Sequence, residues 1–146
     1  MTAQEIWEAS GLEGEYEAWS FGDDPDGLAG LVNSGIKTAT CSAAQLYEIE
    51  GEKLPEAGEY SVILDSRDNA VCVIRTVRVY TVPFRDVDAR HAFMEGEGDR
   101  SLEHWRKVHR DFFIRELESA GLSFCENTPV VCEEFEKVFP KSQNSI

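Results

Sequence analysis

The sequence predicts one α+β domain in which a small mixed, mostly antiparallel sheet curls toward a barrel and helices cover its openings. Three observations predict this class. Residues 59–66 and 70–80 are rich in β-branched side chains and are separated by a short polar turn, which is typical of a hairpin. Residues 101–120 show the clearest helical spacing of apolar side chains. Strands and helices do not alternate regularly, which argues against a doubly wound parallel sheet.

The remaining elements follow from capping residues and local composition. We assign the first helix to a helical extension over about residues 1–20. The predicted helices are residues 2–10, 25–33, 43–50, 88–94 and 101–120. The predicted strands are residues 36–41, 59–66, 70–80 and 129–139. Val82-Pro83-Phe84 is expected to interrupt the sheet, because proline cannot donate a hydrogen bond to a ladder.

Length and composition predict a single domain over residues 1–146. Hydrophobic residues make up 42% of the chain, which is enough for one core. No segment approaches the roughly 18 apolar residues of a membrane span, and the first residues lack the pattern of a signal peptide. The four cysteines form no C-x-x-C pair, so we expect reduced thiols. We therefore expect a cytoplasmic protein that does not contact membranes.

The net charge of −14 bears on the class of ligand. Such a charge disfavours binding of long nucleic acid across a general electrostatic surface, although a local basic groove stays compatible with it. It favours small ligands, short single strands or a basic protein partner.

The segment Gly35–Ser42 concentrates one lysine, several hydroxyl groups and a thiol. In an extended segment, Lys37 and Ala39 would point one way and Thr38 and Thr40 the other, so a turn is needed to bring Lys37 against Thr40. A desolvated lysine can act as a general base toward a hydroxyl nucleophile. The alternative is a surface lysine beside a threonine-rich strand.

An acidic cluster offers a different chemistry. His91 and Glu95 are four residues apart and share one face of a predicted helix, and Glu97 and Asp99 follow closely. Such oxygen atoms suit Mg²⁺ or Mn²⁺, whereas no spacing matches a zinc motif. The alternative is a solvated acidic loop, and we predict no metal site here.

Aromatic and basic side chains supply candidate binding residues. Trp19 and Trp105 could stack on a base, although most aromatic residues of this kind belong to a core. His109 lies near the apolar stripe of the long helix, where a buried, hydrogen-bonded histidine is the default. Arg75 and Arg78 interrupt an apolar strand, and one of them inside the barrel mouth could pair with a phosphate.

Several motifs together resemble those of the ASCH-domain family, which belongs to the PUA-like superfamily. Residues 35–40 resemble the G-x-K-T-x-T motif that opens the barrel of these proteins. Further landmarks are typical of the longer single-domain bacterial subfamily, and the likeness runs from about Trp19 to Val138. These landmarks are Trp19-Ser20-Phe21-Gly22-Asp23, Leu31-Val32-Asn33-Ser34-Gly35, Pro83-Phe84-Arg85-Asp86-Val87 and Trp105-Arg106-Lys107-Val108-His109. The resemblance implies a PUA-like barrel and a role in RNA-linked biochemistry.

The resemblance also implies catalytic residues. ASCH proteins include ribonucleases acting on single-stranded RNA and amidohydrolases acting on acetylated cytidine nucleosides. The amidohydrolase set of a lysine, a threonine three residues later and a distant glutamate matches Lys37, Thr40 and Glu95, with Glu97 as a second match. In the implied mechanism neutral Lys37 takes the proton of Thr40, Thr40 attacks the acetyl carbonyl, and Glu95 protonates the leaving amine. The expected substrate-binding residues are Thr38, Arg75, Glu97, Trp19, Trp105 and His109.

Three functions stay open at this point. The leading hypothesis is a ribonuclease, because the subfamily that this chain resembles includes that activity. The first alternative is an N4-acetylcytidine amidohydrolase, which suits the acidic charge, and the second is an RNA-binding or regulatory module. The expected partners are RNA or a small nucleoside. No cofactor is expected, except Mn²⁺ or Mg²⁺ if the protein is a ribonuclease. A protonated Lys37 would bind phosphate or stabilise an oxyanion.

Overall fold

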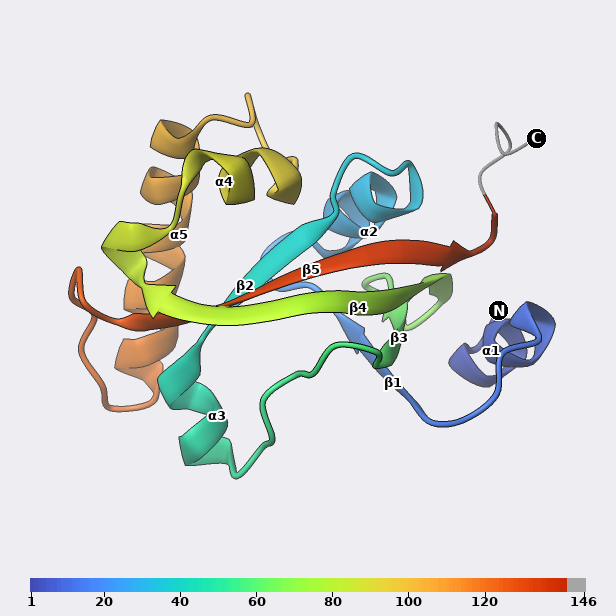
Figure 1. The fold of residues 1–146 in the computed structure, drawn as a ribbon. Helices are drawn as coiled ribbons and strands as arrows, with labels where there is room; N and C mark the ends of the chain where they lie inside the picture. Colours follow the sequence, from blue (N-terminus) through green and yellow to red (C-terminus); the bar gives the residue numbers. More distant parts are fainter. Residues whose placement is uncertain (142–146) are drawn as a thin grey trace.

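The computed structural model describes residues 1–141, so the last five residues of the predicted domain lie outside it. One five-stranded sheet runs through these residues in the order β1-β3-β4-β5-β2 and curls into a half-barrel (Figure 1). The β1–β3 pair is parallel and the other pairs are antiparallel. The strands are β1 (Tyr16–Ser20), β2 (Ala39–Ala43), β3 (Tyr60–Leu64), β4 (Ala70–Pro83) and β5 (Pro129–Phe139). The predicted α+β class with a mixed, mostly antiparallel sheet is confirmed.

Helices flank the sheet, and several of them start at a capping side chain. The hydroxyl of Thr2 accepts from the backbone N–H of Glu5 in a capping box, and the hydroxyl of Ser101 accepts from the backbone N–H of His104 at the start of the longest helix. The helices are α1 (Ala3–Ser10), α2 (Pro25–Asn33), α3 (Ala44–Glu50), the 3₁₀ turn η1 (Phe84–Asp86), α4 (Ala89–Glu95) and α5 (Leu102–Ser119). Figure 1 shows α4 and α5 beside one end of the long β4–β5 pair and α1 beside the other.

Three segments differ from the sequence prediction. The strand predicted over residues 36–41 runs from Ala39 to Ala43, because the backbone N–H groups of residues 36–38 donate to the carbonyl oxygens of Leu31 and Met94. Tyr16–Ser20 is a strand rather than part of a helical extension, because it pairs with the distant β3. The β4 strand continues through Val82 to Pro83 instead of ending at Tyr80. Pro83 is tolerated there because it lies at the last position of the ladder, opposite Pro129, where its missing N–H removes no interior hydrogen bond.

The core consists of clusters on both sides of the sheet. Phe84, Trp105, Phe113 and Leu117 pack where η1 and α5 meet the sheet. A second cluster lies under α2 and includes Val32, Ile63, Ile74 and Phe135, and a third lies under α1. Within the described range, no helix has the length and apolar character needed to cross a bilayer. The four cysteines carry free thiols, and Cys72 and Cys132 are buried.

Candidate active site

A large pocket of about 1750 Å³ opens between the sheet and the α4–α5 region. Its lining brings together six of the predicted site residues, which come from four segments of the chain. These are Trp19, Lys37, Thr40, Glu95, Glu97 and His109. Thr38, Arg75 and Trp105 do not line this pocket.

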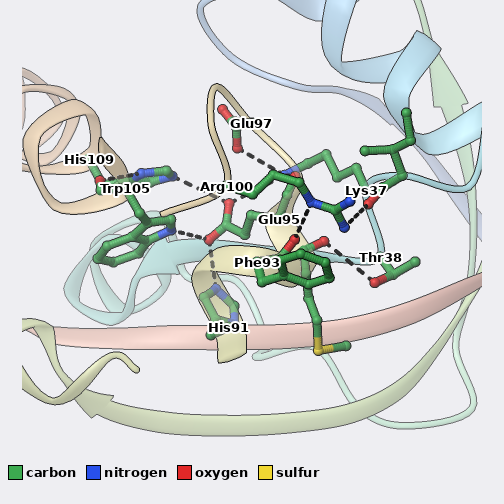
Figure 2. Close-up of polar contacts among 11 residues, drawn as sticks. Lys37, Thr38, His91, Phe93, Glu95, Glu97, Arg100, Trp105 and His109 are labelled. Atoms are coloured by element: carbon green, nitrogen blue, oxygen red, sulfur yellow. Dashed lines mark hydrogen bonds and ion pairs between the residues drawn. The ribbon is translucent and has the colours of Figure 1, made fainter. Parts of the chain in front are cut away.

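Glu95 is the centre of the polar network at this pocket (Figure 2). Its Oε2 atom lies 2.6 Å from both His91 Nε2 and Trp105 Nε1. Its Oε1 atom lies 3.3 Å from both Lys37 Nζ and His109 Nε2. Since an ionised carboxylate only accepts hydrogen bonds, four nitrogen atoms satisfy both of its oxygens.

Lys37 is 1% exposed, and its ammonium group contacts acceptors in α4 and in the loop after it. Its Nζ atom lies 3.3 Å from Glu95 Oε1, 3.3 Å from the Glu95 carbonyl oxygen and 3.1 Å from Glu97 Oε2. Burial opposes the charged form, but the carboxylates of Glu95 and Glu97 outweigh it and raise the Lys37 pKa above its usual value. These contacts therefore favour the ammonium form of Lys37 at neutral pH.

The charges of the cluster balance one another. Burial would raise the pKa of Glu95, but the charges of Lys37 and His109 hold it well below its usual range. Burial would lower the pKa of His109, but Glu95 raises it. His109 Nδ1 lies 2.9 Å from the Trp105 carbonyl oxygen and Nε2 faces Glu95, so both ring nitrogens meet acceptors. The geometry thus favours an imidazolium and an ammonium opposite the carboxylates of Glu95 and Glu97.

Backbone contacts hold the lysine segment against the end of α4. The backbone N–H of Thr38 donates to the Met94 carbonyl oxygen at 2.7 Å. Gly96 adopts the left-handed conformation with φ of 74°, and a Cβ atom there would lie 2.7 Å from the Ile36 carbonyl oxygen. The Arg100 guanidinium donates to the carbonyl oxygen of Ile36 at 3.4 Å. These contacts explain how residues distant in sequence place Lys37 beside Glu95.

Thr40 occupies a separate position in the pocket. It lies in β2, directly opposite Glu133 of β5 in the antiparallel ladder. Its hydroxyl makes no hydrogen bond within residues 1–141, and Lys37 Nζ donates to Glu95 and Glu97 rather than to it. The neighbouring Cys41 thiol instead belongs to the group around Glu95 and His91.

Other predicted site residues have structural partners. Arg75 forms an exposed ion pair with Glu136 at 3.1 Å, outside the pocket. The Thr38 hydroxyl lies 3.4 Å from the Met94 carbonyl oxygen. Trp105 is 2% exposed and stacks on Phe84 and His109, so a base has no room to stack on it. Trp19 lines the pocket and packs edge-on against Phe21.

Two polar residues that sequence reasoning did not place in the site belong to it. His91 is fully buried and holds Glu95 through Nε2, whereas the sequence had placed it only on the same helix face as Glu95. Glu133 lines the pocket, and burial together with the charges of Glu59 and Glu17 raises its pKa to about 7. A signal for Glu133 exists in the sequence, because Glu133 and Glu134 interrupt an apolar strand and must point to opposite faces.

Two groups of side chains have the composition of a metal site. Cys41, His91 and Glu95 form one group, and Glu95, Glu97 and His109 form the other, with ligand atoms within 4.8 Å of one another. The second group already surrounds the Lys37 ammonium, so a divalent cation bound there would meet a buried positive charge. Metal binding would thus require Lys37 to lose its proton or move.

The sequence matches the family model of the ASCH domain over residues 17–139. This chain belongs to the ASCH-domain family. A solved ASCH domain from Lactobacillus crispatus JV V101 is 30% identical, with a TM-score of 0.87 over 92% of each chain. A protein of Enterococcus faecalis V583 is 33% identical, with a TM-score of 0.78 over 93% of this chain and 86% of that chain.

A more distant likeness concerns the fold alone. A hypothetical protein of known structure is 15% identical, with a TM-score of 0.55 over 84% of this chain and 96% of that chain. A search of curated proteins found no match. Because the ASCH fold is PUA-like, the matches confirm the predicted PUA-like α+β architecture of this ASCH domain.

Proposed function

We propose that this ASCH-domain protein is a hydrolase that cleaves an amide on a small, uncharged modified nucleoside, with N4-acetylcytidine as the first substrate to test. The observation that carries the proposal is one pocket that contains both a buried Lys37–Glu95 ion pair and Thr40. These are the three residue types, at the matching positions, that the resemblance assigns to the amidohydrolases.

The charge of the pocket favours a neutral substrate over RNA. Its lining contains nine carboxylate residues but only two lysines, Lys37 and Lys53. The carboxylate residues are Glu15, Glu17, Asp23, Asp24, Glu52, Glu59, Glu95, Glu97 and Glu133. Such a lining, in a chain with a net charge of −14, repels a polyanion and leaves an uncharged nucleoside unaffected.

Lys37 acts in this proposal as the charged stabiliser of the reaction, not as its base. The ammonium group would donate to the oxyanion that forms when Thr40 attacks the acetyl carbonyl. A substrate must first replace one of the three acceptors of Lys37. Glu97 is the one that can leave, because its side chain is 22% exposed whereas that of Glu95 is 1% exposed.

Glu95 acts as a positioning residue. In the mechanism implied by the resemblance it protonates the leaving amine, but here both oxygens are occupied by four nitrogen atoms. Its low pKa also makes it a poor proton donor at neutral pH. Its contacts instead orient Lys37 and His109 toward the pocket.

Ribonuclease activity is the second candidate function. ASCH domains are commonly RNA-binding, and the pocket offers the partly exposed Trp19, Tyr47 and Phe112 as surfaces for a base. A short single strand could place one nucleotide beside the Lys37 ammonium. A binding module without catalysis would use the same aromatic residues.

The test is product analysis after incubation with N4-acetylcytidine and, separately, with a labelled single-stranded RNA. We expect cytidine and acetate from the nucleoside, with a rate at least about 100-fold lower for Thr40→Val. Thr81→Val, on an exposed part of β4, is the matched control and retains the rate. Cleavage of RNA alone would establish the ribonuclease instead, with a chelator then testing metal dependence. Turnover of neither substrate would favour a binding module or a small substrate other than N4-acetylcytidine.

A further inference from the structure

The polar network around Lys37 and Glu95 does not supply a proton acceptor for Thr40. Lys37 is already protonated, and Glu95 is satisfied by four nitrogen atoms. Both ring nitrogens of His109 face acceptors, and Glu97 belongs to the loop after α4 rather than to the β2–β5 ladder that contains Thr40. If Thr40 is a nucleophile, its proton must go to another group.

Glu133 is the ionisable residue placed directly across from Thr40. The two residues are register partners in the antiparallel β2–β5 ladder. Directly opposite side chains lie on the same face of a sheet, with Cβ atoms about 4.5–5.5 Å apart. Both residues line the pocket, so a glutamate side chain is long enough to reach the threonine hydroxyl from the same side.

The Glu133 carboxyl also has no polar partner among residues 1–141. It makes no hydrogen bond or ion pair there, whereas Glu134 on the opposite face binds both Arg78 and Arg90. The titratable groups that act on Glu133 are Glu17 of β1, Glu59 just before β3 and Tyr47 of α3. Burial and these carboxylates raise its pKa to about 7, where a base combines availability with strength.

We propose that Glu133 is the general base that accepts the Thr40 proton, while Lys37 stays charged and stabilises the oxyanion. This inference rests on the proposed role of Thr40 as a nucleophile. It assigns the proton transfer to the sheet and the charge stabilisation to the α4–α5 side of the pocket. It thereby moves to Glu133 the base role that the resemblance assigns to Lys37.

The reaction can be written with every proton placed. The Thr40 oxygen bonds to the acetyl carbon as its proton moves to the Glu133 carboxylate and the carbonyl electron pair becomes an oxyanion beside Lys37. The oxyanion then collapses, the carbon–nitrogen bond breaks, and the Glu133 proton passes to the leaving nitrogen. Water attacks the resulting acetyl ester of Thr40, giving its proton to Glu133. Collapse of this second intermediate releases acetate and returns the proton to Thr40.

The experiment measures acetylation of Thr40 by p-nitrophenyl acetate, an activated ester that requires no nucleoside recognition. Release of p-nitrophenolate gives the rate across neutral pH, and peptide fragmentation in a mass spectrometer locates the acetyl group. We expect the rate at Thr40 to rise with pH and level off above about pH 7, because only ionised Glu133 accepts the proton. In Glu133→Gln the rate falls at least about 100-fold and the inflection disappears.

Two variants separate this role from a merely structural one. Glu136→Gln, on the same strand but paired with Arg75, keeps the wild-type profile. Glu59→Gln removes a neighbouring negative charge, so the inflection moves to lower pH. An unchanged rate in Glu133→Gln, a lower rate with the same inflection, or no acetylation of wild-type Thr40 would overturn the inference.

The outcome for the proposed function is read separately. Acetylation that depends on Glu133, combined with no turnover of N4-acetylcytidine, would reject the substrate and keep Glu133 as the base. Turnover of N4-acetylcytidine with a Glu133→Gln profile equal to wild type would keep the function and reject the role of Glu133.

Discussion

Glu95 and Glu133 are two carboxyl groups in one pocket, and their surroundings move their pKa values in opposite directions. Glu95 is more deeply buried, yet Lys37, His109, His91 and Trp105 keep it ionised. Glu133 meets no cation among the described residues and is close to two other carboxylates, which favour its protonated form. The comparison shows that the donors around a carboxyl, rather than its depth, decide whether it anchors a structure or exchanges a proton.

The largest effect expected from this comparison is the loss of stability when the Glu95 carboxylate is removed. Glu95→Gln leaves the Lys37 ammonium buried with one carboxylate fewer, which is expected to lower the free energy of unfolding by about 3–5 kcal/mol. Urea unfolding at neutral pH measures it. Glu136→Gln is the control, because its exposed pair with Arg75 is worth at most about 1 kcal/mol. Equal losses in the two variants would contradict the role of Glu95 as an anchor.

Glu133 is expected to make the folded protein less stable as pH rises. This is the opposite of the effect expected for Glu95, whose pKa is lowered by folding. The Glu133 pKa of about 7 in the folded protein lies above the usual value near 4.5, so the native state holds the proton more tightly. Stability is therefore lost as pH rises between these two values, by about 3 kcal/mol at most.

The measurement for Glu133 is urea unfolding of Glu133→Gln and wild type at about pH 4 and about pH 8. Glu133→Gln cannot ionise, so the variant is expected to match wild type at the lower pH and to be more stable at the higher one. A variant that is less stable than wild type at the higher pH would show that ionised Glu133 has a stabilising partner.

The smallest effect on stability is expected for Glu97, the more exposed of the two carboxylate partners of Lys37. Glu97→Gln keeps the shape of the side chain but removes one of two carboxylates from the ammonium, and its partly exposed position limits the loss to below about 1 kcal/mol. The binding of N4-acetylcytidine is expected to tighten, because the substrate then displaces a weaker acceptor. Calorimetric titration of both proteins checks this, and weaker binding would show that Glu97 contacts the substrate.

The sequence alone predicted the strands of the hairpin, the long helix and the last strand, because their periodicity and β-branched content are local properties. Lys37, Thr40 and Glu95 were predicted through the family resemblance. The strand Tyr16–Ser20 was missed, since only its pairing with the distant β3 makes it a strand.

Some site residues have other roles in the structure than the sequence predicted, because those roles depend on contacts between residues that are distant in sequence. Trp105 was predicted to stack on a base, but its ring is buried against Phe84 and its N–H donates to Glu95. Glu133 carried a signal as a charge in an apolar strand, but the register that sets it opposite Thr40 is a long-range property.

The most direct test of the contrast between the two carboxyl groups is an NMR titration of the protein labelled with ¹³C at the glutamate carboxyl carbons. Glu95→Gln and Glu133→Gln assign the two resonances. The structure predicts that Glu133 titrates near pH 7 and that Glu95 stays ionised well below pH 4.5 for as long as the protein is folded. Titration of Glu133 near the ordinary value of a glutamate, or of Glu95 above it, would contradict the assignment of base and anchor.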